Sequence, residues 1–343
     1  MIAPPSNRCS TFTTIELQRC TMDKTFSEPK RDSLAGVPDS TFGPVSSRIM
    51  DKRLAGTRVI GFSLAGEESF VAAPEYSVCF DIGRSPREVI PIDNVCLSHG
   101  HMDHAAGIAY YLSQRRFQGN SPGRIIVHRG IAQAVQRLMD CWADIEKHHS
   151  PGQILGVEPL EDVTIRRGLI VRPFEVPHTS TSLGFSLIEV RHRLRPELQG
   201  KSGPELVALK RQGVAIDEYF EMSLLTFTGD TAIGRFLEHD FVQHTRGLLV
   251  ECTFFERDHR TRAVEGRHIH VDDFPRVLEA VPNAEVMIIH HTRRTDIRLA
   301  KRILQKVIRS SDLARVSFLM DRPPRALTPR SHHETNDADS GEP

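Results

Sequence analysis

The sequence predicts a layered α/β domain, and three observations support this fold class. Short apolar runs that end in polar residues recur along the chain, as buried strands do. Between them lie segments with an apolar residue every three or four positions, which is the period of an amphipathic helix. The chain has 343 residues, 39% of them hydrophobic, with 44 basic and 44 acidic residues, which is typical of a globular protein and excludes a disordered polyelectrolyte.

The predicted elements alternate between the two types. In chain order they are a strand at 95–97, a helix at 105–112, strands at 125–127, 183–190, 222–227 and 248–250, a helix at 274–281, a strand at 286–289 and a helix at 297–307. We expect Asp272 to cap the second helix, with Pro275 in its first turn. Such alternation places helices against the faces of a sheet.

The two ends of the chain differ in composition from its centre. Residues 1–52 are rich in serine, threonine and proline without an apolar period, and we expect them to be a disordered extension, as we do the tail at 321–343. The predicted domain spans 53–320. No run reaches the ~20 apolar residues of a membrane span, and no secretory signal is visible, so we expect a cytoplasmic protein without a membrane partner. Acidic residues scattered through 1–52 argue against organelle targeting but leave it as an alternative.

One short run concentrates side chains that bind metals. His99, His101, Asp103 and His104 fall within six residues, directly after a predicted strand and before a predicted helix. The six cysteines form no CxxC pair, so a thiolate site is not expected. Imidazole and carboxylate ligands suit zinc, with manganese or iron as alternatives, and more ligand-type residues than one tetrahedral zinc needs indicate two metal ions.

This run resembles the signature of the metallo-β-lactamase family, which implies a four-layer αββα fold. Three further segments resemble the remaining ligand motifs of that family. His178 ends the strand-like stretch 174–178, and Asp230 follows a strand and a tight glycine turn, as the bridging aspartate of the family does. The last ligand motif ends the strand at 286–289, where His290 or its neighbour His291 is the ligand.

The resemblance narrows to the ribonuclease Z family over residues 58–310. It rests on the stretch 78–84 leading to 98–104, on Glu-Cys-Thr-Phe at 251–254, and on the histidine-bearing loop 266–270. It implies a zinc-dependent phosphodiesterase, an endoribonuclease that removes 3′ trailers from tRNA precursors. Two departures matter. Residues 290–295 lack the aromatic residues usual in that family, and Arg267 interrupts the loop, which leaves His268 and His270 as alternatives for the catalytic histidine.

The resemblance also implies a role for each site residue. One Zn²⁺ would be held by His99, His101 and His178, the other by Asp103, His104 and His290, with Asp230 bridging them. Mn²⁺ or Fe²⁺ are the alternative metals. Asp103 would also orient or deprotonate the attacking water, and His268, held by Glu251, would protonate the leaving oxygen. Glu251 as an ordinary acid at the end of a strand is the alternative.

A basic segment at 191–213 resembles the RNA-gripping arm that the family carries between its third and fourth ligand motifs. We expect it to be a short arm that contacts the phosphates of precursor tRNA through Arg191, Arg193, Arg195, Lys201, Lys210 and Arg211. The family also implies a homodimer, in which one subunit's arm serves the other's site. A solvated basic loop without an RNA role is the alternative.

Two other functions compete with tRNA processing. A metallo-β-lactamase-fold hydrolase of a small thioester, lactone or phosphodiester would share the metal ligands, and the altered terminal motif favours it. A non-catalytic RNA-binding relative is disfavoured because such proteins lose ligands, whereas this sequence has a full set of seven. Cleavage of precursor tRNA that is lost on chelation separates the first hypothesis from the other two.

Overall fold

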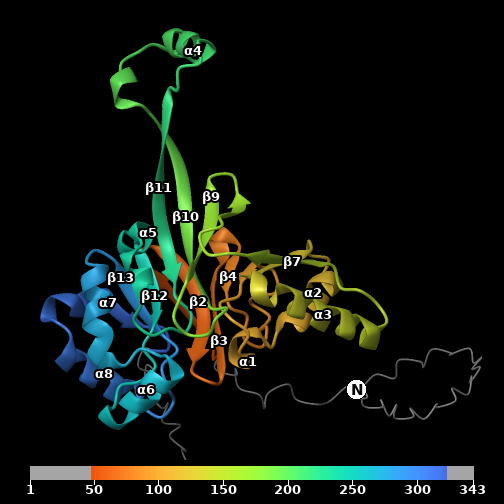
Figure 1. Ribbon diagram of the computed structural model, residues 1–343, viewed down its shortest axis with the longest axis vertical. Helices are drawn as coiled ribbons and strands as arrows, with labels where there is room; N and C mark the ends of the chain where they lie inside the picture. The colour runs from red at the N-terminus through yellow and green to blue at the C-terminus, as the bar shows by residue number, and fades with distance from the viewer. Residues whose placement is uncertain (1–47, 323–343) are drawn as a thin grey trace, which may run out of the picture. The chain divides into compact units, whose positions relative to one another are not determined.

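The structure is a computed structural model that describes residues 48–322. The predictions for the two chain ends therefore lie largely outside the described residues. Strand β1 begins at Met50, ahead of the predicted domain start at residue 53. Two seven-stranded sheets pack face to face and helices cover their outer faces (Figure 1), so the expected four-layer αββα class is confirmed.

The first sheet is built in chain order from residues 50–157. Its strands are β1 (Met50–Leu54), β2 (Thr57–Leu64), β3 (Glu68–Ala73), β4 (Val78–Phe80), β5 (Asn94–Cys96), β6 (Gly123–His128) and β7 (Gly152–Val157). Strands β1 to β4 pair antiparallel, whereas β4 to β7 pair parallel.

The second sheet has the same mixed character. Its strands are β8 (Val163–Arg166), β9 (Leu169–Glu175), β10 (Leu183–Leu194), β11 (Asp217–Phe227), β12 (Gly247–Glu251), β13 (Glu285–Ile289) and β14 (Val316–Phe318). Pairing is antiparallel from β8 to β11 and parallel from β11 to β14.

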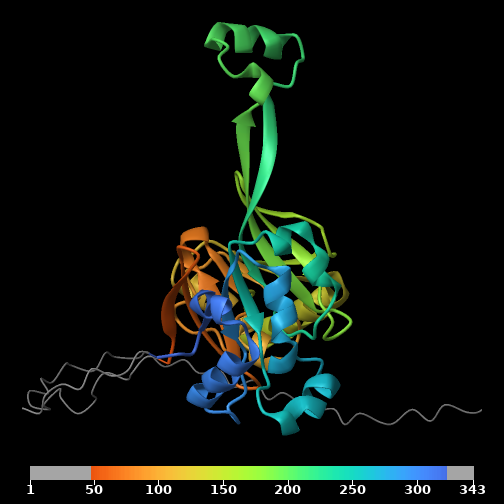
Figure 2. The same cartoon turned by 90° about the vertical axis from the view of Figure 1, so that its left-hand side faces the viewer.

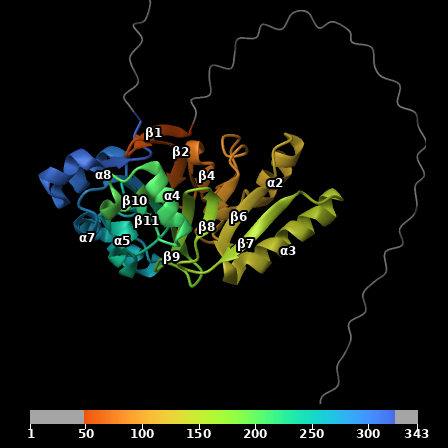
Figure 3. The same ribbon diagram turned by 90° about the horizontal axis from the view of Figure 1, so that it is seen from above.

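Helices on the outer faces complete the four layers, whereas α4 lies at the end of a projecting arm (Figure 1). The α-helices are α1 (Met102–Ala105), α2 (Ile108–Phe117), α3 (Arg129–Glu146), α4 (Gly203–Arg211), α5 (Asp240–Gln243), α6 (Arg260–Gly266), α7 (Phe274–Ala280) and α8 (Ile297–Val307). Short 3-10 helices span Pro74–Tyr76, Pro196–Leu198, Arg235–Glu238, Arg257–His259, Val271–Asp273 and Ser310–Arg315. Seen from above, α2 and α3 lie on one side of the sheets and α7 and α8 on the other (Figure 3). Within residues 48–322, no helix is both long and apolar enough to span a membrane.

Three apolar clusters hold the layers together. The central one lies between the sheets, where the rings of Phe80 from β4 and Phe227 from β11 stack with their centroids 5.1 Å apart. Under α2 and α3, Tyr111 and Met139 pack on the first sheet, and under α7 and α8, Leu278 packs on the second. Full burial of each such side chain contributes about 1.5–3 kcal/mol. Phe80 and Phe227 also end the strands that lead to functional residues, so the core fixes the ligand loops.

All six predicted strands are confirmed, as is the helix at 297–307, whose N-cap Asp296 accepts a hydrogen bond from the Arg298 amide at 2.8 Å. The predicted helix at 105–112 is wrong in extent, because the chain breaks between α1 and α2. At the break, Gly107 donates to the Gly83 carbonyl, and a Cβ on Gly107 would lie 2.4 Å from the Ser85 amide nitrogen.

The predicted cap of the helix at 274–281 is also wrong. Asp272 lies inside the short 3-10 helix Val271–Asp273, and Asp273 occupies the N-cap position of α7. Pro275 does lie in the first turn, as expected. The 3-10 turn forms because His270 holds the amide of Asp272 with its own side chain.

Strands β10 and β11 continue beyond the sheet as a two-stranded arm that carries α4 (Figures 1 and 2). The pairing runs outward to Leu194 opposite Asp217. At the tip, Ser202 and Glu205 form a capping box for α4. The arm therefore includes the outer half of β11, which lies beyond the predicted 191–213 segment.

Candidate metal centre

The ligand-type side chains meet because several strands end at the same edge of the molecule. Strand β9 runs antiparallel to β10, and β10 antiparallel to β11, so β9, β11, β12 and β13 all point the same way. At or just after their carboxyl ends lie His178, Asp230, Glu251 and His290. In the first sheet, β5 ends two residues before Ser98 and delivers the run from His99 to His104 to the same place.

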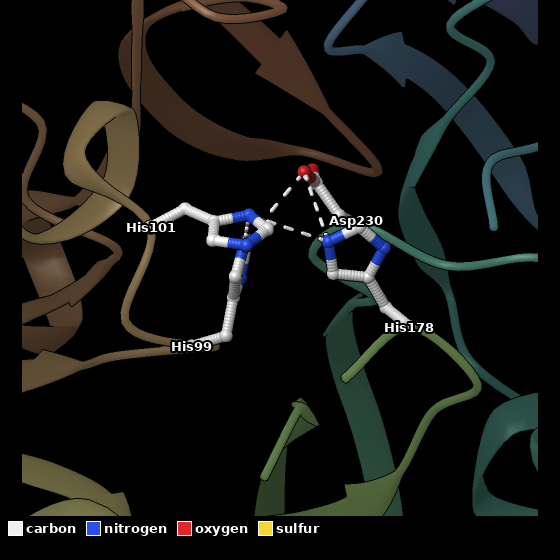
Figure 4. A group of neighbouring side chains, drawn as sticks. All are labelled: His99, His101, His178 and Asp230. Carbon is white, nitrogen blue, oxygen red and sulfur yellow. Dashed lines mark hydrogen bonds and ion pairs between the residues drawn. The ribbon is translucent and has the colours of Figure 1, made fainter. Parts of the chain in front are cut away.

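His99, His101, His178 and Asp230 form the first group, whose ligand atoms lie within 4.8 Å of one another. Figure 4 shows the three imidazoles and the carboxylate pointing toward a common centre. Oδ2 of Asp230 lies 3.8 Å from His99 Nε2 and 3.9 Å from His178 Nε2. Burial, followed by the charge of His104, lowers the pKa of His99 to about 2, so its imidazole is neutral and free to donate a lone pair.

Asp103, His104 and His290 form a second group beside the first. Asp230 contacts both groups, because its Oδ2 lies 3.4 Å from His104 Nε2 and its Oδ1 lies 3.3 Å from His290 Nδ1. Asp103 Oδ2 lies 3.6 Å from the Nε2 atoms of both histidines. Asp230 thus lies between the two groups, in the place that the family resemblance gives to a shared carboxylate.

The cluster contains buried polar atoms without hydrogen-bond partners. They are His104 Nε2, His290 Nε2 and Asp230 Oδ1. A buried polar atom left unsatisfied costs about 1–3 kcal/mol, and more when it is charged. Three such atoms in one cluster of imidazole nitrogens and carboxylate oxygens fit a divalent metal site, since coordination would satisfy them.

Outer residues orient the histidines toward the cluster. The buried carboxylate of Asp81 accepts from Nδ1 of His104 at 2.6 Å and from the amide of Ser98 at 2.7 Å. The Ser98 hydroxyl lies 2.9 Å from Nδ1 of His99. Both histidines therefore use Nδ1 for a protein partner and turn Nε2 toward the cluster, as metal-binding histidines do.

The turn before Asp230 depends on Gly229. Its φ is +61°, a conformation that glycine adopts without steric cost. A Cβ at this position would lie 2.7 Å from the Cβ of Ser98. Gly229 thus allows the loop after β11 to approach the loop after β5, which brings Asp230 against His99.

His268 and Glu251 form a hydrogen-bonded pair beside the cluster. Nδ1 of His268 lies 2.7 Å from Oε1 of Glu251, and its ring centroid lies 5.0 Å from that of His178. Burial alone lowers the pKa of His268, but the charge and hydrogen bond of Glu251 outweigh it and raise this pKa to about 9. His268 is thus protonated at neutral pH.

Glu251 and His268 also lie within ligand distance of Asp230 and His290. However, each oxygen of Glu251 already accepts two hydrogen bonds. Oε1 accepts from the Thr231 amide and His268, and Oε2 accepts from the Thr253 hydroxyl and the Ile269 amide. With its lone pairs used in this way, Glu251 suits the role of a positioning group better than that of a metal ligand.

The sequence left two choices open, between His268 and His270 and between His290 and His291, and the structure shows which member of each pair reaches the cluster. His270 lies away from the cluster, where its Nε2 donates to the Glu256 carbonyl at 3.0 Å and its Nδ1 accepts from the Asp272 amide. His291 is buried against Phe318, at a ring distance of 6.3 Å. The members of each pair that reach the cluster are His268 and His290.

The predicted RNA-binding residues lie on the arm and its tip. Arg191, Arg193 and Arg195 form ion pairs with the acids Glu189, Glu218 and Glu197. Lys201, Lys210 and Arg211 form no ion pair within the described part of the chain.

Sequence reasoning missed several residues that the structure places beside functional ones. On the arm, Tyr219 is 70% exposed and Phe220 is 36% exposed, which adds aromatic surface to the basic segment. At the cluster, Asp81 and Ser98 were not predicted as positioning residues. An acid directly after a buried strand, as at Asp81, is the signal that could have found one of them.

Comparisons with known proteins agree with this geometry. A profile of the beta-lactamase superfamily domain matches residues 80–291. Nuclear ribonuclease Z of Triticum aestivum is 32% identical over 163 residues, which cover 48% of this chain and 93% of that protein. The chain belongs to the ribonuclease Z family. Within that family, tRNase Z TRZ1 of Arabidopsis thaliana is 28% identical over 249 residues, covering 72% of this chain and 89% of the relative.

Among solved structures, the metallo-beta-lactamase fold protein YhfI from Bacillus subtilis superposes with a TM-score of 0.53. The match covers 75% of this chain and 93% of YhfI at 14% identity, which supports the fold alone. Membership of the ribonuclease Z family and its beta-lactamase superfamily implies a divalent metal ion, and the histidine and aspartate groups described above could hold it.

Proposed function

We propose that this chain is an endoribonuclease that removes 3′ trailers from tRNA precursors by hydrolysing a phosphodiester. Its relatives in the ribonuclease Z family include proteins named tRNase Z and ribonuclease Z. The observation that carries the proposal is the position of the His268–Glu251 pair directly beside the seven-residue cluster. The cluster can hold metal ions, and the pair offers a proton, so the two parts that phosphodiester hydrolysis needs lie side by side.

In this proposal the cluster would hold two zinc ions. His99, His101 and His178 would hold one, Asp103, His104 and His290 would hold the other, and Asp230 would be shared between them. The two groups of ligand atoms and the shared carboxylate support this assignment. When bound, such ions neutralise the charge of the phosphodiester and lower the pKa of water.

Asp103 receives the proton of the attacking water. Its carboxylate faces the second group, and its Oδ2 accepts from the amide of Gly66 at 2.9 Å, which fixes its orientation. Burial raises the pKa of Asp103, but His290 and His104, whose Nε2 atoms lie 3.6 Å from its Oδ2, outweigh this effect and lower it. The carboxylate is therefore ionised at neutral pH and able to accept a proton.

His268 donates a proton to the 3′ oxygen of the leaving ribose. Glu251 accepts a hydrogen bond from Nδ1 of the imidazole, which leaves Nε2 as the atom that can donate to the leaving group. Because Glu251 raises the pKa of His268 to about 9, the proton is present at neutral pH. General acid catalysis of this kind contributes about 10²–10⁴-fold to a rate.

The arm binds the RNA, and the chain acts as a homodimer. Strand β10 starts at Leu183, five residues after His178, and ends at Leu194, so its twelve residues place the tip of the arm roughly 35–40 Å along the strand from the cluster of the same chain. Phosphate contacts by Lys201, Lys210 and Arg211 would therefore be remote from that cluster. In the homodimer that we infer, the arm of each subunit would hold RNA for the cluster of the other.

Cleavage of a 5′-labelled precursor tRNA by the zinc-loaded protein tests the proposal. Asp103→Ala should abolish cleavage at the 3′ end of the mature tRNA, and His268→Ala should weaken it about 10²–10⁴-fold. His244→Ala, a change at an exposed histidine on the end of α5, serves as the matched control and should cleave like wild type. An intact precursor in the presence of bound metal would refute the tRNA assignment and direct the search to small esters and phosphodiesters.

A further inference from the structure

Arg267 joins the two loops that carry His178 and His268. It follows α6 and directly precedes His268, yet both of its contacts to another loop go to His178, 89 residues earlier in the chain. We propose that Arg267 is a positioning residue that locks the loop of His268 onto the metal ligand His178. This inference rests on the roles proposed above for those two histidines.

The first contact sets the tautomer of His178. Nδ1 of this imidazole lies 3.3 Å from the backbone carbonyl oxygen of Arg267. Since a carbonyl only accepts hydrogen bonds, Nδ1 must carry the proton. Nε2 then has its lone pair free, and it faces Asp230 Oδ2 at 3.9 Å and His101 Nδ1 at 3.4 Å. The Arg267 carbonyl thus does for His178 what Asp81 does for His104.

The second contact runs in the opposite sense. Nη1 of the Arg267 guanidinium donates to the backbone carbonyl of His178 at 3.0 Å. Together the two bonds form a closed ring of contacts between the residues, which we call the Arg267 clasp. A single bond would allow the loops to rotate about it, whereas two bonds restrict both the position and the direction of one loop relative to the other.

The backbone at Arg267 places His268 within reach of the cluster. Arg267 has φ 53° and ψ 53°, the left-handed conformation in which residues other than glycine are uncommon. Its amide donates to the Val264 carbonyl at 3.2 Å, and the His268 amide donates to the Ala263 carbonyl at 2.8 Å. This turn directs the imidazole of His268 toward Glu251. Glycine would adopt the turn more easily, but it would lack the guanidinium that closes the clasp.

The clasp couples the metal ligand to the proton donor. A displacement of the 263–268 turn moves the acceptor of His178 Nδ1 and the imidazole of His268 together, since both belong to adjacent residues. Loss of the guanidinium should therefore loosen the turn and weaken metal binding at the first group. It should also lower the rate of the chemical step without changing how tightly the RNA is held.

Arg267→Gly tests this role, because glycine keeps the backbone carbonyl and suits the left-handed turn. Arg262→Ala is the control for charge, since Arg262 is exposed on the same helix and makes no hydrogen bond or ion pair within residues 48–322. Three properties are measured: amide hydrogen exchange in peptides covering 263–270, zinc retention against a chelator, and single-turnover cleavage of precursor tRNA.

For Arg267→Gly we expect exchange at the His268 amide to be about two- to tenfold faster, with a similar loss of zinc affinity, which is the range that one lost hydrogen bond gives. The cleavage rate at saturating RNA should fall while KM stays unchanged, and Arg267→Lys should restore part of each property. Arg262→Ala should leave exchange and zinc retention at the wild-type level. Wild-type exchange and zinc retention in Arg267→Gly would overturn the proposal. Neither measurement involves RNA, so the clasp can be judged even if the chain leaves tRNA precursors intact.

Discussion

Replacing Glu251 by glutamine separates the catalytic function of the His268–Glu251 pair from its packing. All four partners of Glu251 are donors in the structure, and the carboxylate is fully buried. A glutamine has one accepting oxygen and one donating nitrogen. Whichever way its amide is turned, the nitrogen faces a backbone N–H, that of Thr231 or that of Ile269, and neither can rotate away.

The size of the effect follows from these contacts. One buried N–H left without an acceptor costs about 1–3 kcal/mol of unfolding free energy. The loss of the negative charge beside His268 removes the imidazolium at neutral pH, so cleavage should fall about 10²–10⁴-fold. Glu256→Gln is the matched control, because Glu256 lies nearby and accepts from the Thr295 hydroxyl but does not contact His268.

Urea unfolding measures the first effect, and single-turnover cleavage of precursor tRNA measures the second. The two must be read together, since a destabilised protein also loses activity. The reasoning would be refuted if Glu251→Gln unfolded at the wild-type urea concentration and cleaved within tenfold of wild type, because both arguments depend on an acceptor-only group at this position.

Three further predictions concern the metal cluster, the arm and the core. Asp230→Asn keeps the shape of the side chain but removes the charge shared by both groups, so elemental analysis should show lost zinc and cleavage should fall at least about 100-fold; a variant that retains both metals would contradict the bridging role. Lys210→Ala with Arg211→Ala should raise KM for RNA at constant kcat and make the salt dependence of binding shallower by about one unit per lost phosphate contact, whereas an unchanged slope would mean that α4 does not bind RNA. Burial raises the pKa of Asp93, but hydrogen bonds, including one from the buried Arg115, outweigh it and hold this pKa below its usual value, so this pairing stabilises the fold above about pH 4 and is lost as the pH falls further. Asp93→Asn should therefore cost about 0.5–1.5 kcal/mol in urea unfolding at pH 7, since solvent screens the half-exposed carboxylate, and progressively less below pH 4; an equal cost at pH 7 and pH 3 would contradict this account.

Several members of the cluster are marked locally in the sequence. The run from His99 to His104 is contiguous, and Asp230 follows a glycine whose tight turn is visible in the sequence. The strands that lead to these residues are buried on both faces and give unbroken apolar runs. Local signals of this kind can be recognised without any knowledge of tertiary contacts.

Other parts of the fold were not predicted. Helix α3 was overlooked even though its apolar residues Val135, Leu138, Met139 and Trp142 recur at the spacing of an amphipathic helix. The outer halves of β10 and β11 extend beyond the sheet, so no buried face imposes an alternating pattern on them.

Positioning contacts were the hardest to predict. The acceptor of His178 Nδ1 is a backbone atom 89 residues away, and the carboxylate that orients His104 belongs to Asp81 on a different loop. Backbone carbonyls leave no trace in residue types, and pairs this far apart in the chain become visible only when the two sheets are placed against each other. The sequence could not distinguish His268 from His270 for a similar reason, because both are histidines in one short loop and only their tertiary contacts differ.

The two sheets contribute different residues to the cluster, so a bound cation would stabilise the protein against unfolding by linking them. His99, His101, Asp103 and His104 come from the first half of the chain, and His178, Asp230 and His290 from the second. A cation held by both sets acts as a reversible cross-link across the interface that Phe80 and Phe227 seal. Its contribution to stability grows with the logarithm of its free concentration, so the supply of the divalent ion would set how long the folded chain resists proteolysis.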